Sequence, residues 1–353
     1  MVYRPKTFWS WSFLLIALVE SLIVLAFEGY VFAKFQNNLV DRDDRIANGV
    51  NNDFQYPQER TIPTYLTLFI FGHLFMLFMV YDALRLKNTI QIIGLCLFNV
   101  ALLIYAAIQK DQIKEADQYL KTEGARALVD KEGVWKAIEP FLIAIPCVLA
   151  LGTVLLSVVC WKLYDEFAWT IYKHISADLR MKRRYLTFQI FVALLKFDFF
   201  FFLGFTVQFL VIVLQTNDIE FKLTIVVIPL TVLFLLAAVW ATRRENRILM
   251  SGVIVIFLAS LAYFLFKLIR MYTDKTRVND YMPARRSLTS FAVITILLIV
   301  VTIVNAVVCT LNFGKGLKPH ITKSTIEDGD EKHPMTDMNP HMAQPMSTRM
   351  EID

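Results

Sequence analysis

Long apolar segments dominate this chain and limit what it can fold into. A membrane-spanning helix needs about 20 mostly apolar residues, because each residue advances a helix by about 1.5 Å and the hydrocarbon core is about 30 Å thick. Eight segments meet this requirement: Phe8–Phe35, Pro63–Leu84, Asn88–Ile108, Ile138–Trp161, Tyr185–Leu214, Leu223–Ala241, Ile248–Leu268 and Leu288–Phe313. Backbone polar groups in lipid must bond to one another, so these segments predict helices rather than lipid-facing loops.

The composition is also that of a membrane protein. Of the 353 residues, 56% are hydrophobic, and the mean hydropathy is +0.51, whereas soluble domains contain about 45–50% apolar residues. The net charge is only +5 and the basic residues are dispersed, which argues against a nucleic-acid-binding protein. The four cysteines lie within apolar segments, so we expect packing residues rather than disulfides. We therefore predict an all-α, polytopic transmembrane helix bundle of about eight spans, or seven if one segment does not cross.

The chain divides into a membrane domain and a tail. We expect residues 1–313 to form one multi-span helical domain. Within it, residues 109–137 predict a helical lumenal loop, because apolar residues recur there at helical spacing; a flexible solvated loop is the alternative. Residues 162–184 predict a basic cytosolic loop, whose aromatic residues beside basic ones suit a helix lying on anionic lipid. Residues 314–353 have too little apolar surface to fold, so we predict a disordered cytosolic tail.

The Lys and Arg residues of the short loops indicate the orientation. Cytosolic loops of membrane proteins carry an excess of these residues. With eight spans, the basic stretches 85–87, 180–184 and 243–247 fall on one side together with both termini. We expect that side to be cytosolic. Residues 267–286 oppose this assignment, because they are also basic but fall on the other side.

Four charged side chains lie away from the ends of the apolar segments and are the candidate functional residues: Glu20, Glu28, Lys196 and Asp198. A charge at the bilayer centre costs about 3 kcal/mol on insertion scales, so such residues normally face the bundle interior and find partners. Glu20 and Glu28 are eight positions apart and share a helix face. Lys196 and Asp198 point about 200° apart, so their helix needs protein on two sides.

Depth in the membrane suggests partners for these charges. Lys196 and Glu20 lie at a similar distance from the cytosolic ends of their segments, which predicts an ion pair between them. Asp198 needs a polar side chain from another span, and three are candidates: His73, Asn99 and Asn305. The charges form either an ion relay or polar substrate site, or a structural pair that fixes helix register. We favour the structural role, because no further chain of acidic or histidine residues extends a relay.

The sequence carries no recognisable catalytic constellation. It lacks H-E-x-x-H, a Walker loop and a rhomboid-like G-x-S-G motif. Asp82 in "VYDAL" lacks the second aspartate motif that an intramembrane protease would need. We expect a non-enzymatic protein without a metal or cofactor. We also find no evident internal repeat, which argues against a transporter.

The phenylalanines of "FDFFFFLGF" encircle one segment, and the chain contains 29 phenylalanines in all. We expect these rings to fill gaps between neighbouring helices. A contact with sterol or lipid is the alternative interpretation.

The tail contains two candidate phosphorylation sites, Ser324 and Thr325, in "KSTIEDGDE". Acidic residues follow both, as is typical of acidic-directed phosphorylation, which would add up to two negative charges per site. A solvated acidic stretch is the alternative. The tail is also rich in Met and His. Such residues are soft ligands for Cu(I), but chance enrichment is the simpler interpretation.

Three segments together resemble a known family: "YDALRLKNTIQIIGLCLFNVALLIYAAIQ" (Tyr81–Gln109), Trp161–Val213 and "ATRRENR" (Ala241–Arg247). The chain from Phe8 to Phe313 resembles a fungal family of polytopic Golgi apparatus membrane proteins. The resemblance implies a multi-span helical fold in the Golgi membrane and no activity, so it transfers no functional residues.

We therefore expect a Golgi-resident, multi-pass protein without enzymatic activity, surrounded by membrane lipids, for which a role in organisation or trafficking is conceivable. The alternative is a transporter of a small solute, ion or lipid that uses Glu20, Lys196 and Asp198.

Overall fold

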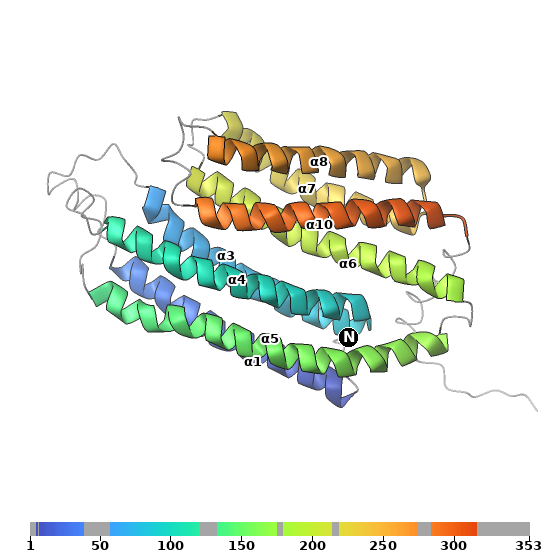
Figure 1. Cartoon of the computed structure of the whole chain (residues 1–353), viewed down its shortest axis with the longest axis horizontal. Coiled ribbons are helices and arrows are strands. Elements are labelled where there is room, and N and C mark those ends of the chain that lie inside the picture. The colour runs from blue at the N-terminus through green and yellow to red at the C-terminus, as the bar shows by residue number, and fades with distance from the viewer. Residues whose placement is uncertain are drawn as a thin grey trace, which may run out of the picture.

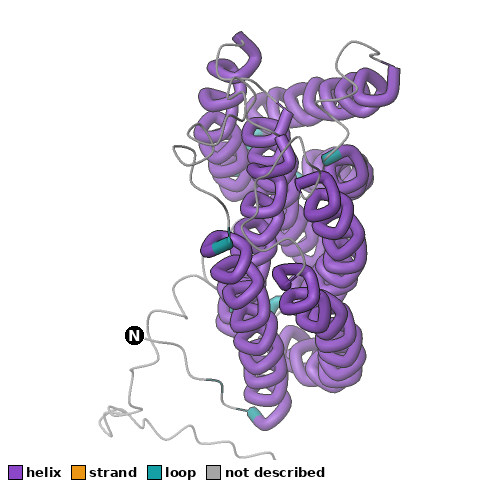
Figure 2. Tube along the Cα trace, turned by 90° about the vertical axis from the view of Figure 1, so that its left-hand side faces the viewer, coloured by secondary structure: helices purple, strands orange, loops and turns teal. Residues whose placement is uncertain are grey.

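The protein is a bundle of long helices. The structure, a computed structural model, describes residues 5, 7–38, 57–120, 133–174, 179–213, 219–273 and 284–315. Its helices are α1 (Phe8–Asn37), α3 (Pro57–Arg85), α4 (Thr89–Leu120), α5 (Gly133–His174), α6 (Leu179–Gln208) with the π-helical extension η1 (Phe209–Val213), α7 (Ile219–Arg243), α8 (Arg247–Thr273) and α10 (Arg285–Asn312). Eight helices of the described residues are long and apolar enough to cross a membrane, which confirms the eight-span prediction. Figure 2 shows helices and short loops, and no strand, in the described part.

Several helices extend beyond the apolar segments that predict them. α4 continues to Leu120 and α5 begins at Gly133, so the predicted lumenal loop 109–137 is largely an extension of these two helices. α5 continues to His174 and α6 begins at Leu179, so residues 162–184 are also mostly helical rather than a loop. The Lys, Glu, Gln and Ala residues there favour helix and allow it to continue outside the bilayer.

Parts of the sequence analysis concern residues outside the described chain. The predicted tail 314–353 lies outside it apart from its first two residues. Ser324 and Thr325 lie outside the described residues as well.

The eight spans form two halves with the same arrangement of helices. The first half consists of α1, α3, α4 and α5, and the second of α6, α7, α8 and α10 (Figure 1). In each half the first helix packs against the second and fourth, and the third helix also packs against the second and fourth. The chain crosses the membrane four times between a helix of the first half and its equivalent in the second half. The two equivalent helices therefore run in the same direction. The sequence shows no evident internal repeat, but the two halves share this order of neighbouring helices.

Two matching turns preserve this repeat at the atomic level. The turn between α3 and α4 contains Lys87 at φ 48°, and the turn between α7 and α8 contains Glu245 at φ 53°. Each is followed by an asparagine that caps the next helix, an ordinary role for this residue. Asn88 Oδ1 accepts from two backbone N–H groups at 3.1 and 3.3 Å, and Asn246 Oδ1 does so at 3.0 and 3.3 Å.

The sequences of the two turns also match. Residues 83–88 read ALRLKN and residues 241–246 read ATRREN, so Ala, Arg and Asn occupy equivalent positions. This A-x-R-x-x-N pattern is too short to find a repeat without the structure. We call the end of the bundle that carries both turns the tight-turn end; α1 and α6 begin at this end and α10 ends there.

Candidate functional site

Lys196 forms an ion pair with Asp82, in the last turn of α3. Its Nζ also donates to Gln91 Oε1 at 2.9 Å, and Gln91 Nε2 in turn donates to Asp82 Oδ2 at 2.9 Å. The predicted pairing of Lys196 with Glu20 is therefore wrong. The reason is helix order: α1 packs against α5 and α3, whereas α6 packs against α10, α7, α4 and α3.

Asp198 lies fully buried and accepts a hydrogen bond from Thr302 Oγ1 of α10 at 2.7 Å. Its three predicted partners are engaged elsewhere, so that prediction is also wrong. His73 Nδ1 bonds to Phe69 O, Asn99 Nδ2 donates to Thr153 Oγ1, and Asn305 Nδ2 donates to Thr187 O. The helix that contains Lys196 and Asp198 does have protein on two sides, as the angle between these residues requires.

Glu20 and Glu28 are both buried on the inner face of α1. Glu20 lies against Gly152 of α5, where an added Cβ would overlap the carboxyl group. Glu28 accepts from Gln109 Nε2, at 3.2 and 3.3 Å from its two oxygens. Amide and hydroxyl partners of this kind orient a carboxyl group within the bundle. The four charged candidates thus occupy separate places and do not converge on one site.

Each half has, on its first helix, a buried acid that faces the fourth helix; Glu28 of α1 is a further buried acid in the first half. Glu20 of α1 faces α5, and Asp198 of α6 faces α10, which are the fourth helices of their halves. Asp198 joins a first helix to a fourth through its hydrogen bond with Thr302, whereas Glu20 only lies in close contact with Gly152. The structural role favoured by the sequence stays a prediction.

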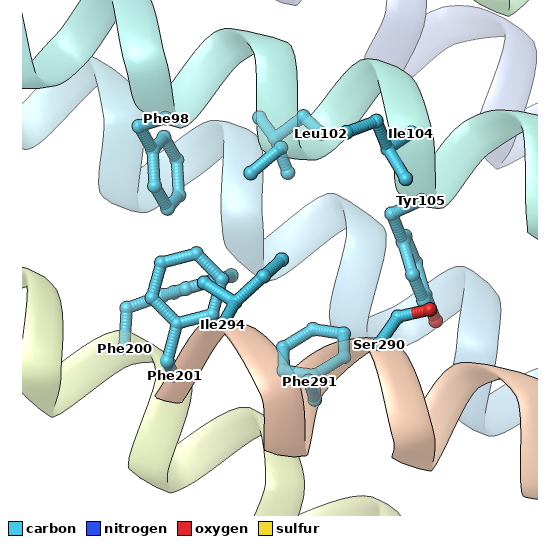
Figure 3. A pocket seen from close by; sticks show the side chains of 10 residues that line it. Phe98, Leu102, Ile104, Tyr105, Phe200, Phe201, Ser290, Phe291 and Ile294 are labelled. Carbon is cyan, nitrogen blue, oxygen red and sulfur yellow. The ribbon is translucent and has the colours of Figure 1, made fainter. Parts of the chain in front are cut away.

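The centre of the interface between the halves is filled by aromatic rings. Phe98 of α4 packs edge-to-face on Phe200 of α6, with ring centroids 4.8 Å apart, and Phe201 and Phe291 continue the cluster. Figure 3 shows these rings meeting between α4, α6 and α10. The remaining hollow is about 10 Å³, no larger than one water molecule needs. Most of the phenylalanines of "FDFFFFLGF" therefore pack between helices, as expected.

A larger hollow lies at the side of the same interface, between α3 of the first half and α6 and α7 of the second. We call it the lateral groove. Its volume is about 600 Å³, within the range of small-molecule sites. Its walls are almost entirely apolar and include Phe75, Phe78, Leu195, Phe199, Leu235 and Val239. Phe78 and Leu236 of these walls are exposed, so the groove faces the surrounding bilayer.

The only charged lining residues of the lateral groove among the described residues are Asp82 and Lys196. About a quarter of each side chain is exposed, 25% for Asp82 and 26% for Lys196. Asp82 lies in the last turn of α3, beside the Leu86–Asn88 turn, so the pair closes the groove at the tight-turn end. Away from the pair, a further hollow of about 410 Å³ shares Phe71 and Leu203 with the groove and extends toward Pro63.

Lys196 lies near the middle of its apolar segment, but along the bundle axis it does not lie midway between the two ends of the first half. α6 extends beyond the turn between α3 and α4, as Figure 1 shows. Lys196 is level with that turn because it contacts Asp82 and Gln91, which flank it. Sequence reasoning identified Lys196 but missed both partners. Asp82 is a charged residue near the end of an apolar segment, so the sequence could have indicated it as a partner. Gln91 is uncharged, so the sequence gave no such indication.

Comparison with known proteins identifies the family of the chain. A relative in Schizosaccharomyces pombe, named UPF0658 Golgi apparatus membrane protein, is 38% identical over 333 residues, which is 90% of each chain. No family model and no solved structure matches the chain. A match over 90% of each chain must include residues of both halves of the bundle. The chain belongs to the UPF0658 family of Golgi apparatus membrane proteins.

Proposed function

We propose that this protein is a Golgi-resident, non-enzymatic membrane protein that binds a bilayer phospholipid in its lateral groove. The observation that carries the proposal is the groove itself: an apolar hollow of about 600 Å³ that faces the bilayer and ends on the Asp82–Lys196 pair. A phospholipid has the same division into an apolar body and a charged end. Golgi residence is supported by the name of the relative in Schizosaccharomyces pombe.

The length of the groove suits one acyl chain of one leaflet. Asp82 and Phe71 mark its two ends along α3. The eleven helical rises from Phe71 to Asp82 span about 16 Å, roughly half of a hydrocarbon core of about 30 Å. A lipid with its headgroup at the ion pair would therefore place its acyl chain along the groove without crossing the midplane.

The placement of the charged groups supports a binding role rather than catalysis. Chemistry on a lipid headgroup would need several reactive groups around one point. The ion pair lies instead in a self-contained triad with Gln91, and Glu20, Glu28 and Asp198 lie elsewhere. In the part of the chain that the structure describes, no group of three or more His, Cys, Asp or Glu residues could hold a metal.

Filling the groove tests the proposal. Val232 lines the groove from α7, so a Val232→Trp substitution should occupy the space of an acyl chain. The protein is purified from membranes in mild detergent, and retained phospholipid is measured by native mass spectrometry. We expect retention to fall roughly tenfold, which corresponds to about 1.4 kcal/mol of binding free energy.

The neighbouring residue gives a matched control. Leu233 is 63% exposed on another face of α7, and it does not line the groove. Leu233→Trp should leave retention unchanged. Equal retention by wild type and Val232→Trp, with both folded, would overturn the proposal. Fluorescence microscopy of a tagged chain tests the location, and a signal outside the Golgi would refute residence there.

Lipid transfer between leaflets is a second candidate function, favoured by the repeat. Parallel repeats occur in transporters, whose substrate sites lie where the repeats meet, and the lateral groove lies at such a junction. Reconstitution into liposomes with a fluorescent phospholipid tests it. Faster dithionite quenching with wild type than with Val232→Trp would support transfer, and equal rates would limit the protein to binding.

A further inference from the structure

We propose that the lateral groove selects a zwitterionic phospholipid, with its headgroup ammonium at Asp82 and its phosphate at Lys196. This inference rests on the proposed function and adds the chemical class of the lipid. It follows from the hydrogen bonds within the triad of Asp82, Lys196 and Gln91, and from the donor and acceptor that these bonds do not use.

The triad retains one acceptor and one donor for a ligand. Both hydrogen bonds to Asp82 use Oδ2, from Lys196 Nζ and from Gln91 Nε2, so Oδ1 remains an acceptor among the described contacts. A lysine ammonium has three N–H donors. Lys196 directs two of them to Asp82 and Gln91, so the third remains for a phosphate oxygen. A carboxylate oxygen beside an ammonium hydrogen complements a molecule that carries the opposite arrangement.

Gln91 fixes which side of each charge faces the ligand. Its amide donates to Asp82 Oδ2 and to Met79 O at 3.0 Å, and its oxygen accepts from Lys196. Gln91 is fully buried, so the amide cannot turn toward solvent. The two charges are therefore held in position before a lipid arrives, which lowers the entropic cost of binding.

The charge balance of the groove favours a neutral headgroup with separated charges. Asp82 and Lys196 sum to zero, and the other lining residues are uncharged. An anionic headgroup would place its excess negative charge beside the Asp82 carboxylate, and close charges repel strongly where water is scarce. A lipid without charges would leave the free Oδ1 and the free N–H hydrogen without partners. A zwitterion satisfies both.

Lipid competition tests the class. The full chain is reconstituted in nanodiscs that contain equal amounts of phosphatidylethanolamine and phosphatidylglycerol with identical acyl chains. It is then re-extracted, and the ratio of the two retained lipids is measured by mass spectrometry. We expect wild type to enrich phosphatidylethanolamine. Asp82→Asn removes the negative charge and should shift the ratio toward phosphatidylglycerol roughly tenfold, the effect of one charged hydrogen bond.

Two further variants make the test independent of folding. Asp82→Lys combined with Lys196→Asp restores an ion pair of zero net charge and should retain the preference for phosphatidylethanolamine. Arg85→Gln removes an exposed cation at the same end of α3, outside the groove lining, and should leave the ratio unchanged.

The outcomes separate this inference from the proposed function. If Val232→Trp releases lipid but wild type and Asp82→Asn retain the same lipid ratio, the groove binds lipid without selecting this headgroup and the inference is wrong. If Val232→Trp releases no lipid, the proposed function fails first. A ratio that shifts equally in Arg85→Gln would also overturn the inference, because the effect would then be one of surface charge.

Discussion

α3 and α7 are the second helices of the two halves, yet they have different surroundings. In the most apolar 18-residue stretch of each helix, 56% is buried in α3 but only 17% in α7. α3 packs against α1, α4, α6 and η1, whereas α7 has α6, α8 and a short contact with η1. The same repeat unit therefore supplies an enclosed helix in one half and an open one in the other. Repetition fixes the neighbours within a half, but contact between the halves decides which helix remains open.

The difference is also present in the side chains. α3 directs the large residues Tyr65, Phe69 and Met76 into the core, and all three are fully buried. α7 is mainly Val, Leu and Ile on every face, and most of its large residues are exposed. A helix that is apolar all round can face lipid without cost. α7 is thus suited to border a hollow that a lipid fills.

Two glycines test the same kind of contrast between packed and open positions. Gly152 of α5 lies where a Cβ would overlap the Glu20 carboxyl group, whereas Gly252 on α8 has nothing within 4 Å of an added Cβ. Gly152→Leu should abolish the folded protein, because both the α5 backbone and a buried charged group would have to move. Gly252→Leu should be tolerated. Fluorescence-detected size-exclusion chromatography of the two variants measures the difference, and equal profiles would refute the difference in packing between these two positions.

Truncation of a core ring should have the next largest effect. Phe200 is 2% exposed and contacts the rings of Phe75, Phe98 and Phe291. Phe200→Ala should cost about 3–5 kcal/mol of unfolding free energy through the cavity that it leaves. Leu233→Ala on the lipid-facing side of α7 should cost well under half as much. Thermal unfolding in detergent measures both, and a similar shift in melting temperature for the two would contradict the assignment of Phe200 to the core.

Loss of one buried hydrogen bond should have the smallest effect of the three. Thr302→Val removes the donor to Asp198 and leaves a buried carboxyl oxygen unpaired, at a cost of about 1–3 kcal/mol. Thr231 on α7 bonds only to the carbonyl of Val227 in its own helix. Thr231→Val should therefore change the unfolding free energy little. The same thermal measurement checks both variants, and an unchanged Thr302→Val would mean that this contact does not stabilise the bundle.

The sequence predicts the spans well because apolar length is a local property. It predicts that Lys196 and Asp198 face protein for the same reason, since the angle between them depends only on their spacing. Their partners depend on which helices are neighbours, and depth alone chose Glu20 where the fold supplies Asp82. Thr302 gave no signal, because most threonines in these helices bond to their own backbone. The lateral groove could not be predicted from the sequence either, because it arises from how the two halves pack against each other.

The hairpin of α3 and α4 also sets the depth of its charged pair. Its turn is level with the midpoint of the span 180–212, where Lys196 lies. The spans of α3 and α4 cover 25 and 30 residues, which at about 1.5 Å per residue is more than a hydrocarbon core of about 30 Å needs. The hairpin is therefore long enough to cross the whole membrane, and its turn would lie at one membrane surface. Lys196, although central in its own apolar segment, would then meet water and headgroups beside the end of a neighbouring hairpin.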